Sequence, residues 1–319
     1  MARVATKLST DICSKQPYWA RFRKDMRSNW SLYLVFMPVV VYYFVFCYLP
    51  MYGATIAFKD FSPMAGILGS EWVGFKHFAD FFTSSDFKRI FFNTLNISLQ
   101  SLMFGFPAPI ILALMINEVE NAKWKKLVQT ITYLPHFISL VVICGIIRNF
   151  VSDTGVITVA LNSLGVVENV DMLSNKELFV PIYIISDIWQ SVGWGSIIYL
   201  AALTGINQEL YEAASIDGAG RWRQLFAVTI PGILPTVVIM LILRVGNIMS
   251  LGFEKIILLY NPLTYETADV ISSYVYRRGL MEFNFSYSTA VGLFNSVINF
   301  ILIFAANTIS KKVNDTSLW

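Results

Sequence analysis

Six long apolar blocks constrain this chain more than any other feature. They run from Leu32 to Leu49, Ile90 to Ile116, Val128 to Ile147, Phe179 to Leu203, Ile233 to Gly252 and Ala290 to Ala306. A helix needs about 20 mainly apolar residues to cross a bilayer core. Continuous apolar runs lack the alternation of barrel strands, and only helices or closed barrels satisfy their backbone in lipid. The sequence therefore predicts an all-α, polytopic membrane protein with six transmembrane helices.

The composition agrees with a membrane protein. The chain of 319 residues is 55% hydrophobic and only 14% charged, which is too apolar for a soluble domain of this length. The first block is long enough to span a membrane and lacks an A-x-A cleavage site, so we expect an uncleaved anchor. The cysteines, Cys13, Cys47 and Cys144, have no metal-like spacing and are interpreted as packing residues, with no metal site.

The distribution of positive charge predicts the orientation. More than half of the 24 lysines and arginines lie in the N-terminal segment 1–29, in the loops around 123–126 and 221–223, and in the tail 311–319. The positive-inside rule then places both termini in the cytoplasm, on either side of a membrane domain at 30–310. Two interpretations of segment 1–29 stay open: a basic amphipathic helix on the inner leaflet, or only a topogenic charge cluster.

The sharpest local pattern lies in the expected cytoplasmic loop 204–231. Asn207 can cap a helix that begins at Gln208, and Gly218 can end it in the left-handed conformation. Ala213 and Ala214 give this helix a small, flat face, while Glu212 and Asp217 offer carboxylates. The pattern predicts a short exposed helix that could dock against another protein, although an ordinary linker helix would have the same pattern.

The same loop matches a family pattern. The pattern E-A-A, three residues, G, nine residues, I-x-L-P is matched at Glu212, Ala213, Ala214, Gly218 and Pro231, with Val228 and Ile230 at its hydrophobic positions. On these residues the chain resembles the permease subunits of binding-protein-dependent ABC importers. Further similar stretches, at 117–119, 133–137, 194–202 and 285–292, resemble the subgroup for complex carbohydrates, which includes permeases of bacterial alginate importers.

This resemblance implies a type I permease architecture in the inner membrane and a set of partners. They are an ATPase dimer, a second permease that we expect to be a different chain, an extracytoplasmic solute-binding protein and an oligo- or polysaccharide substrate; no nucleic acid is implied. The residues implied to couple to the ATPase are Glu212, Ala213, Ala214, Asp217, Gly218 and Pro231. The chain has no G-x-x-x-x-G-K-[ST] run, so we expect no cofactor here and ATP with Mg²⁺ on the partner subunits.

Polar residues recur at helical spacing inside the apolar blocks. Such residues face a cavity or one another because they are costly in lipid. Amides and indoles suit the hydroxyls and ring faces of a sugar, whereas the alternative is hydrogen bonding between helices. The candidates for the substrate path are Asn93, Asn96, Gln100, Asp187, Trp189, Gln190, Trp194, Arg244, Asn247 and Asn295.

Two of these candidates, Asp187 and Arg244, are the only ionisable residues well inside the blocks. They either pair with each other, or Arg244 meets a carboxylate of the substrate. His136 is interpreted as a packing residue, since no second ligand lies at metal spacing. Aromatic residues in the loops on the periplasmic side are expected to dock the binding protein, namely Trp72, Phe75 and Tyr274.

Three other functions compete with an importer of acidic sugar. A permease for a neutral oligosaccharide would have the same architecture. A secondary transporter would be expected to show an internal repeat or an acidic pair, and neither is seen. A membrane enzyme would need a reactive constellation, but the chain has no H-E-x-x-H or G-x-S-x-G run and only two histidines.

Overall fold

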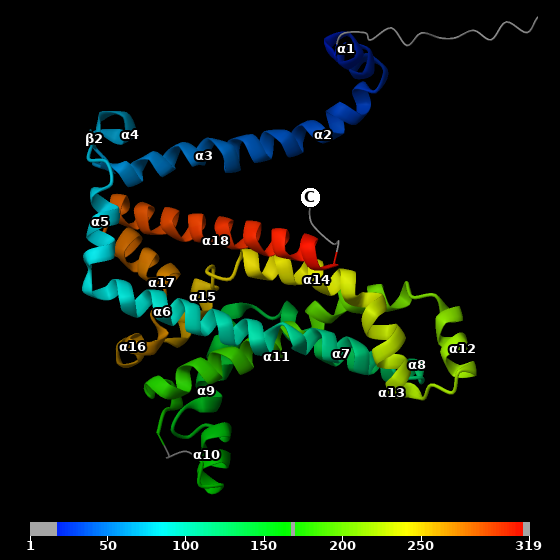
Figure 1. Ribbon diagram of the computed structural model, residues 1–319. Coiled ribbons are helices and arrows are strands. Elements are labelled where there is room, and N and C mark those ends of the chain that lie inside the picture. The colour runs from blue at the N-terminus through cyan, green and yellow to red at the C-terminus, as the bar shows by residue number, and fades with distance from the viewer. Residues whose placement is uncertain (1–17, 167–169, 315–319) are drawn as a thin grey trace, which may run out of the picture. The chain divides into compact units, whose positions relative to one another are not determined.

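The chain folds almost entirely into helices (Figure 1). This computed structural model describes residues 18–166 and 170–314. The basic residues Arg3, Lys7 and Lys15, Cys13 and the tail from 315 lie outside the described residues. The chain divides into two units, Met1–Thr55 and Ile56–Trp319.

The first unit consists of α1 (Tyr18–Ser28), α2 (Trp30–Tyr43), the π-helical turn η1 (Phe44–Tyr48) and α3 (Leu49–Met51), followed by the 3-10 helix η2 (Tyr52–Phe58). Asp25 fixes the elbow after α1, since it accepts hydrogen bonds from Asn29 Nδ2 at 2.7 Å and from Tyr33 Oη at 2.5 Å. Both hydrogen bonds lower the pKa of Asp25, and the bond from Tyr33 has the larger effect. Trp30–Phe58 is long and apolar enough to cross a membrane, and α2 has no buried residue, as expected of a helix solvated by lipid.

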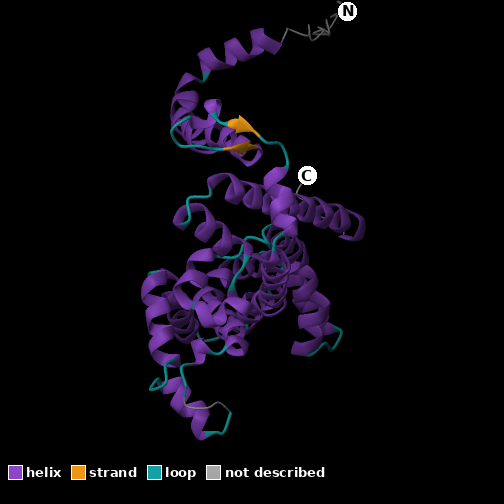
Figure 2. Cartoon of the chain, turned by 90° about the vertical axis from the view of Figure 1, so that its left-hand side faces the viewer, coloured by secondary structure: helices purple, strands orange, loops and turns teal. Residues whose placement is uncertain are grey.

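The second unit begins with a two-stranded antiparallel hairpin, orange in Figure 2. Its elements are β1 (Lys59–Asp60), α4 (Gly66–Gly69), β2 (Glu71–Trp72), α5 (Lys76–Thr83), α6 (Ser85–Gln100), η3 (Ser101–Gly105), α7 (Pro107–Asn117), α8 (Ala122–Tyr133), η4 (Leu134–Phe137), α9 (Leu140–Val151), α10 (Val156–Ser163), η5 (Met172–Ser174), α11 (Lys176–Thr204), α12 (Gln208–Ile216), α13 (Arg221–Gln224), η6 (Leu225–Thr229), α14 (Ile230–Gly246), α15 (Phe253–Leu259), η7 (Pro262–Thr264), α16 (Tyr265–Ala268), α17 (Ile271–Tyr276), η8 (Arg277–Met281) and α18 (Phe285–Asn314).

The all-α membrane architecture predicted from the sequence is confirmed. Five helical stretches of the described chain are long and apolar enough to span a membrane: Trp30–Phe58, Ser85–Asn117, Leu140–Ser163, Arg221–Gly246 and Phe285–Lys312. The fourth predicted block corresponds to α11, a helix of 29 residues that carries polar side chains along its length and is not among the five. The predicted count of six is therefore approximately right.

Two predicted spans were wrong in detail. Val128–Ile147 is not one helix, because α8 gives way to the 3-10 turn η4 around Pro135 and α9 starts only at Leu140. Proline lacks the N–H that a continuous helix needs there. The span predicted to reach Gly252 ends at Gly246 instead, where Asn247 leaves the helical conformation with φ −114°.

Helix α11 lies at the centre of this unit. It packs against α7, α8 and α14, and α14 packs in turn against α18. Gly193 lets α11 approach α8 very closely, because a Cβ at this position would lie 2.0 Å from the carbonyl oxygen of Thr132. The buried apolar residues form three clusters: one around α9, α11 and α15, one around α6, α17 and α18, and one where α7, α11 and α14 meet.

Candidate functional site

Helix α12 stands at one end of the second unit, away from α16 and α17 (Figure 1). The side chain of Asn207 caps it by accepting a hydrogen bond from the Glu209 amide at 3.1 Å. At the other end Gly218 takes φ +75°, a conformation that side-chain-bearing residues rarely adopt, and the Ala219 amide closes the turn on the Ala214 carbonyl at 2.9 Å. The predicted start and stop of this helix are therefore both found.

The residues of the family pattern are accessible on α12. Glu212, Ala213, Asp217 and Gly218 are exposed and Ala214 is half-buried, while Pro231 lies in the first turn of α14. Tyr211, within α12, connects this helix to the segment that follows it, because its hydroxyl lies 3.0 Å from Thr229 Oγ1.

Ile216, the last residue of α12, was not predicted from the sequence. Its side chain is 86% exposed, more than that of Trp222 at 77% in the same loop. The signal that could have found it is its place beside Asp217, at the tip of a helix already expected to dock.

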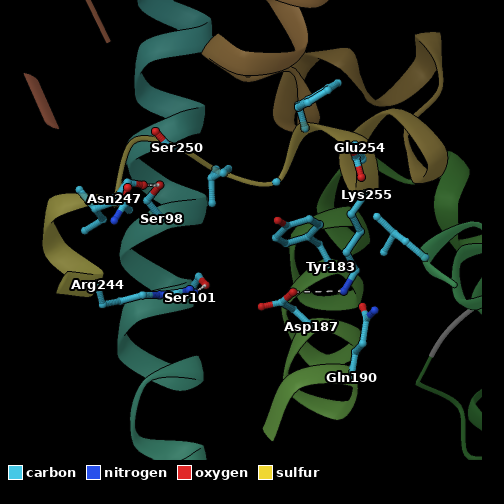
Figure 3. A pocket seen from close by; sticks show the side chains of 15 residues that line it. Ser98, Ser101, Tyr183, Asp187, Gln190, Arg244, Asn247, Ser250, Glu254 and Lys255 are labelled. Atoms are coloured by element: carbon cyan, nitrogen blue, oxygen red, sulfur yellow. Dashed lines mark hydrogen bonds and ion pairs between the residues drawn. The ribbon is translucent and has the colours of Figure 1, made fainter. Parts of the chain in front are cut away.

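A cavity of about 380 Å³ lies where α6, α11, α14 and α15 converge (Figure 3). Its volume is at the lower end of typical small-molecule sites, which measure about 300–1,000 Å³. Four residues predicted for the substrate path line it together: Asp187, Gln190, Arg244 and Asn247. The other polar residues that line the cavity were not predicted from the sequence; they are Ser98, Ser101, Tyr183, Ser250, Glu254 and Lys255.

The ion pair considered between Asp187 and Arg244 does not form. Asp187 Oδ1 lies 3.4 Å from the ammonium of Lys255, which comes from α15, outside the predicted apolar blocks. Arg244 instead donates a hydrogen bond from Nη2 to the hydroxyl of Ser101 at 2.9 Å. The two charged groups face the cavity from opposite sides, Arg244 beside α6 and Asp187 beside α15 (Figure 3).

Lys255 is the most deeply buried charge of the cavity. Only 4% of the residue is exposed, and its ammonium lies 5.3 Å from the centroid of the Tyr183 ring. Burial lowers the pKa of Lys255, while the carboxylate of Asp187 acts in the opposite direction. The nearby carboxylate therefore favours the charged form of this buried ammonium.

The other predicted path residues are placed elsewhere. Asn93 donates hydrogen bonds to the carbonyls of Glu266 at 2.9 Å and Asp269 at 3.1 Å, so it ties α6 to α16. Gln100 donates to Asn96 Oδ1 at 2.9 Å within α6. For these residues the alternative of structural hydrogen bonding fits the contacts.

The remaining three lie outside the cavity lining. Trp194 stacks on the ring of His136, with centroids 4.7 Å apart, which agrees with a packing role for that histidine. Trp189 is 46% exposed. Asn295 has a buried side-chain oxygen without a hydrogen-bond partner among the described residues.

The end opposite α12 holds a buried ion cluster that the sequence did not indicate. Asp269 is fully buried and accepts hydrogen bonds from Arg277 Nη2 at 2.6 Å and Nη1 at 3.2 Å. Burial acts to lower the pKa of Arg277, but the hydrogen bonds and the charge of Asp269 outweigh this effect and raise that pKa.

The aromatic residues predicted to dock a binding protein differ in exposure. Tyr274 is 1% exposed, so its predicted docking role was wrong, whereas Trp72 and Phe75 are exposed at 62% and 72%.

The chain belongs to the family described as the binding-protein-dependent transport system inner membrane component, whose model matches residues 105–315. The matched residues include α12 and the cavity's α11, α14 and α15. The resemblance drawn from the loop pattern is thereby confirmed. The family is one of transport permeases and not of enzymes.

Individual relatives cover nearly the whole chain. It is 47% identical over 294 residues to Protein LplB of Bacillus subtilis (strain 168), covering 92% of each chain. It is 44% identical over 289 residues to the polygalacturonan/rhamnogalacturonan transport system permease protein YteP of the same organism, covering 90% of each.

Solved structures agree with these relatives. A chain in the crystal structure of a bacterial ABC transporter involved in the import of the acidic polysaccharide alginate superposes with a TM-score of 0.85 at 46% identity, over 92% of this chain and 99% of that one. A chain in the structure of bacterial alginate ABC transporter in complex with alginate pentasaccharide-bound periplasmic protein matches with a TM-score of 0.85 at 45% identity, over 93% and 100%.

Proposed function

We propose that this chain forms half of the translocation path of an ATP-driven importer for an acidic oligo- or polysaccharide. The observation that carries the proposal is the state of Arg244. Its side chain is exposed and lines the cavity, and no described carboxylate lies within ion-pair distance of it. A cation in that setting is available to an anionic group of a substrate.

The chemistry of a guanidinium suits this role. Arginine has five N–H donors, and the hydrogen bond to Ser101 uses one of them. Two of the others can hold a carboxylate in a bidentate arrangement. Ser101 fixes the side chain of Arg244 without neutralising it, so the charge remains for a uronate carboxylate that passes through the cavity.

The relatives support an acidic sugar as the substrate class. One similar structure is that of a transporter involved in the import of the acidic polysaccharide alginate, and one relative is named for polygalacturonan and rhamnogalacturonan. Alginate is accordingly the first substrate to test. In this proposal a soluble binding protein, like the periplasmic protein in the second structure, delivers the sugar to the side opposite α12.

Energy for transport comes in this proposal from a separate ATPase dimer, which binds ATP and Mg²⁺ and docks on α12. The accessible Glu212, Ala213 and Asp217 provide the contact surface, and a second permease completes the path. The chain lies in the inner membrane with both termini in the cytoplasm. The positive charges support this orientation. Arg221 and Arg223 lie in α13, next to α12, and Lys311 and Lys312 lie in the last turn of α18, at the end of that helix on the α12 side (Figure 1).

The test is uptake by the complete importer in proteoliposomes, with a uronate pentasaccharide and the same pentasaccharide after reduction of its carboxylates to alcohols. We expect ATP-dependent uptake of the acidic sugar and little of the reduced one. Uptake without ATP or without the partner subunits would instead favour a secondary transporter, and uptake of neither sugar would reject the proposal.

A neutral oligosaccharide is the second candidate substrate. The observation in its favour is the uncharged polar lining of the cavity, with the amides of Gln190 and Asn247 and the hydroxyl of Ser250. Such groups bind sugar hydroxyls as readily as they bind a uronate. Equal uptake of the acidic and the reduced pentasaccharide would support this candidate.

A further inference from the structure

Lys255 has an environment that packing alone does not account for. It follows the loop after α14 and is the third residue of α15, yet its ammonium is buried beside Tyr183 in the wall of the cavity. Removing an ammonium ion from water costs several kcal/mol unless an ion pair and good hydrogen bonds compensate. In the described chain one carboxylate lies within ion-pair distance of it, that of Asp187.

The pair between Lys255 and Asp187 is loose and open on one side. The distance of 3.4 Å is longer than the roughly 2.7–2.9 Å of a strong charge-assisted hydrogen bond. The side chain of Asp187 is 32% exposed against 5% for that of Lys255, and its carboxylate points into the cavity (Figure 3). The anion of the pair can therefore move into the cavity while the cation stays in the wall.

We propose that Lys255 is a second site for a substrate carboxylate, and that Asp187 is an exchangeable counter-ion which holds this site when no substrate is present. As a uronate enters the cavity, the substrate carboxylate takes the place of Asp187 on the ammonium, and the Asp187 carboxylate moves away from Lys255 into the open part of the cavity. The inference rests on the proposed function, because it assumes an acidic sugar in this path.

The exchange explains how a buried cation can serve transport without trapping the sugar. Binding to an unpaired buried ammonium would be tight, since the substrate would gain a full ion pair in a site of low dielectric. Replacing one carboxylate by another gains only the difference between two similar pairs. A permeation path needs such contacts, strong enough to admit the substrate and weak enough to release it. Arg244, on the other side of the cavity, would receive the next carboxylate.

The experiment compares Lys255→Met, Asp187→Asn and the double variant in the complete importer, each with the uronate pentasaccharide and its carboxyl-reduced form. Lys255→Met should lower uptake of the acidic sugar by about ten-fold, at the lower end of the range for one hydrogen bond to a charged group, because the exchange gains only the difference between two pairs. Uptake of the reduced sugar should stay within about two-fold. Asp187→Asn should lower the KM for the acidic sugar and also its maximal rate, because the ammonium has lost its competitor.

The double variant keeps the inference testable if Lys255→Met leaves Asp187 unpaired and the protein poorly produced. It buries no charge at this place and should be produced normally, and it should still lose uptake of the acidic sugar selectively. The exposed pair of Lys176 and Glu266, 2.9 Å apart, provides a matched control on the same helix as Asp187. Lys176→Met should leave uptake of both sugars unchanged.

Equal losses for both sugars, with production restored in the double variant, would overturn the inference and leave a structural ion pair. An unchanged KM in Asp187→Asn would overturn the exchange. Both outcomes differ from failure of the proposed function, in which the unmodified importer would not take up the acidic sugar with ATP.

Discussion

Helix α12 and the cavity are built in opposite ways. Helix α12 is a convex, exposed element whose contacts come from residues within about one short loop, such as its cap at Asn207 and its end at Gly218. The cavity is concave and takes its lining from α6, α9, α11, α14 and α15, with a buried charge in its wall. A change on α12 should therefore alter contacts with a partner and little else, whereas a change in the cavity affects both substrate and packing.

The largest effect is expected at Glu212. Glu212→Arg reverses an accessible charge at the proposed ATPase contact, and like charges across an interface cost several kcal/mol. ATP-driven uptake should fall by about a hundred-fold, since each 1.4 kcal/mol is a factor of about ten. The protein should still insert in the membrane, and less ATPase should co-purify with it.

The matched control for Glu212→Arg is Glu120→Arg. Glu120 is an exposed carboxylate outside α12 whose pair with Arg221, at 2.8 Å, is exposed on both sides and contributes at most about 1 kcal/mol. Normal uptake in Glu212→Arg, or equal losses in both variants, would remove α12 from the coupling role.

A smaller and more selective effect is expected at Arg244. Arg244→Gln keeps a donor for Ser101 but removes the charge, so uptake of the acidic pentasaccharide should fall about ten-fold while that of the reduced form is kept. Arg244→Lys restores charge without the bidentate geometry and should recover only part of the rate. If Arg244→Gln slows both sugars alike, the residue supports the wall of the cavity and does not select the substrate.

The contrast between the two regions also decides what the sequence could reveal. The cap at Asn207 and the stop at Gly218 lie next to α12 in the sequence, so cap, helix and stop could be predicted, and the family pattern of the same loop could be matched. The cavity brings together residues as far apart as Ser101 and Lys255. Periodicity identified Asp187 and Arg244 as polar residues within helices, but periodicity carries no information on which distant residue meets them.

Lys255 shows this limit most clearly. It lies in a seven-residue helix beyond the predicted end of an apolar block, and nothing local distinguishes it from a loop lysine. The early end of α14 at Gly246 shows the same limit, because tertiary context overrides local composition at a helix end. The interruption at Pro135 is different, because it follows from the missing N–H of a single proline. Six apolar blocks predicted the fold class well, since lipid imposes helices without regard to tertiary detail.

A modest effect is expected at Ile216. Its exposed side chain at the tip of α12 would be covered by a docked ATPase, and partial burial of an isoleucine contributes about 1 kcal/mol. Ile216→Ser should therefore weaken binding of the ATPase about five-fold in a titration with the complete permease pair in nanodiscs. Leu68→Ser, an equally exposed residue in α4 at 84%, serves as the control and should leave the affinity unchanged.

The smallest effect is expected at Asn207, where local helix stability alone is altered. Asn207→Ala removes the cap on the Glu209 amide and should destabilise α12 by about 1 kcal/mol. Because α12 is also held through Tyr211 and Thr229, it should fray at its start without unfolding. Hydrogen exchange at the first amides of α12 should become about five-fold faster, while ATPase affinity changes by no more than about two-fold. Asn207→Ser keeps a capping oxygen without placing a second carboxylate beside Glu209, and it should exchange like the unmodified protein. Exchange in Asn207→Ala at the unmodified rate would mean that docking contacts or the neighbouring loops, and not the local cap, determine where α12 begins.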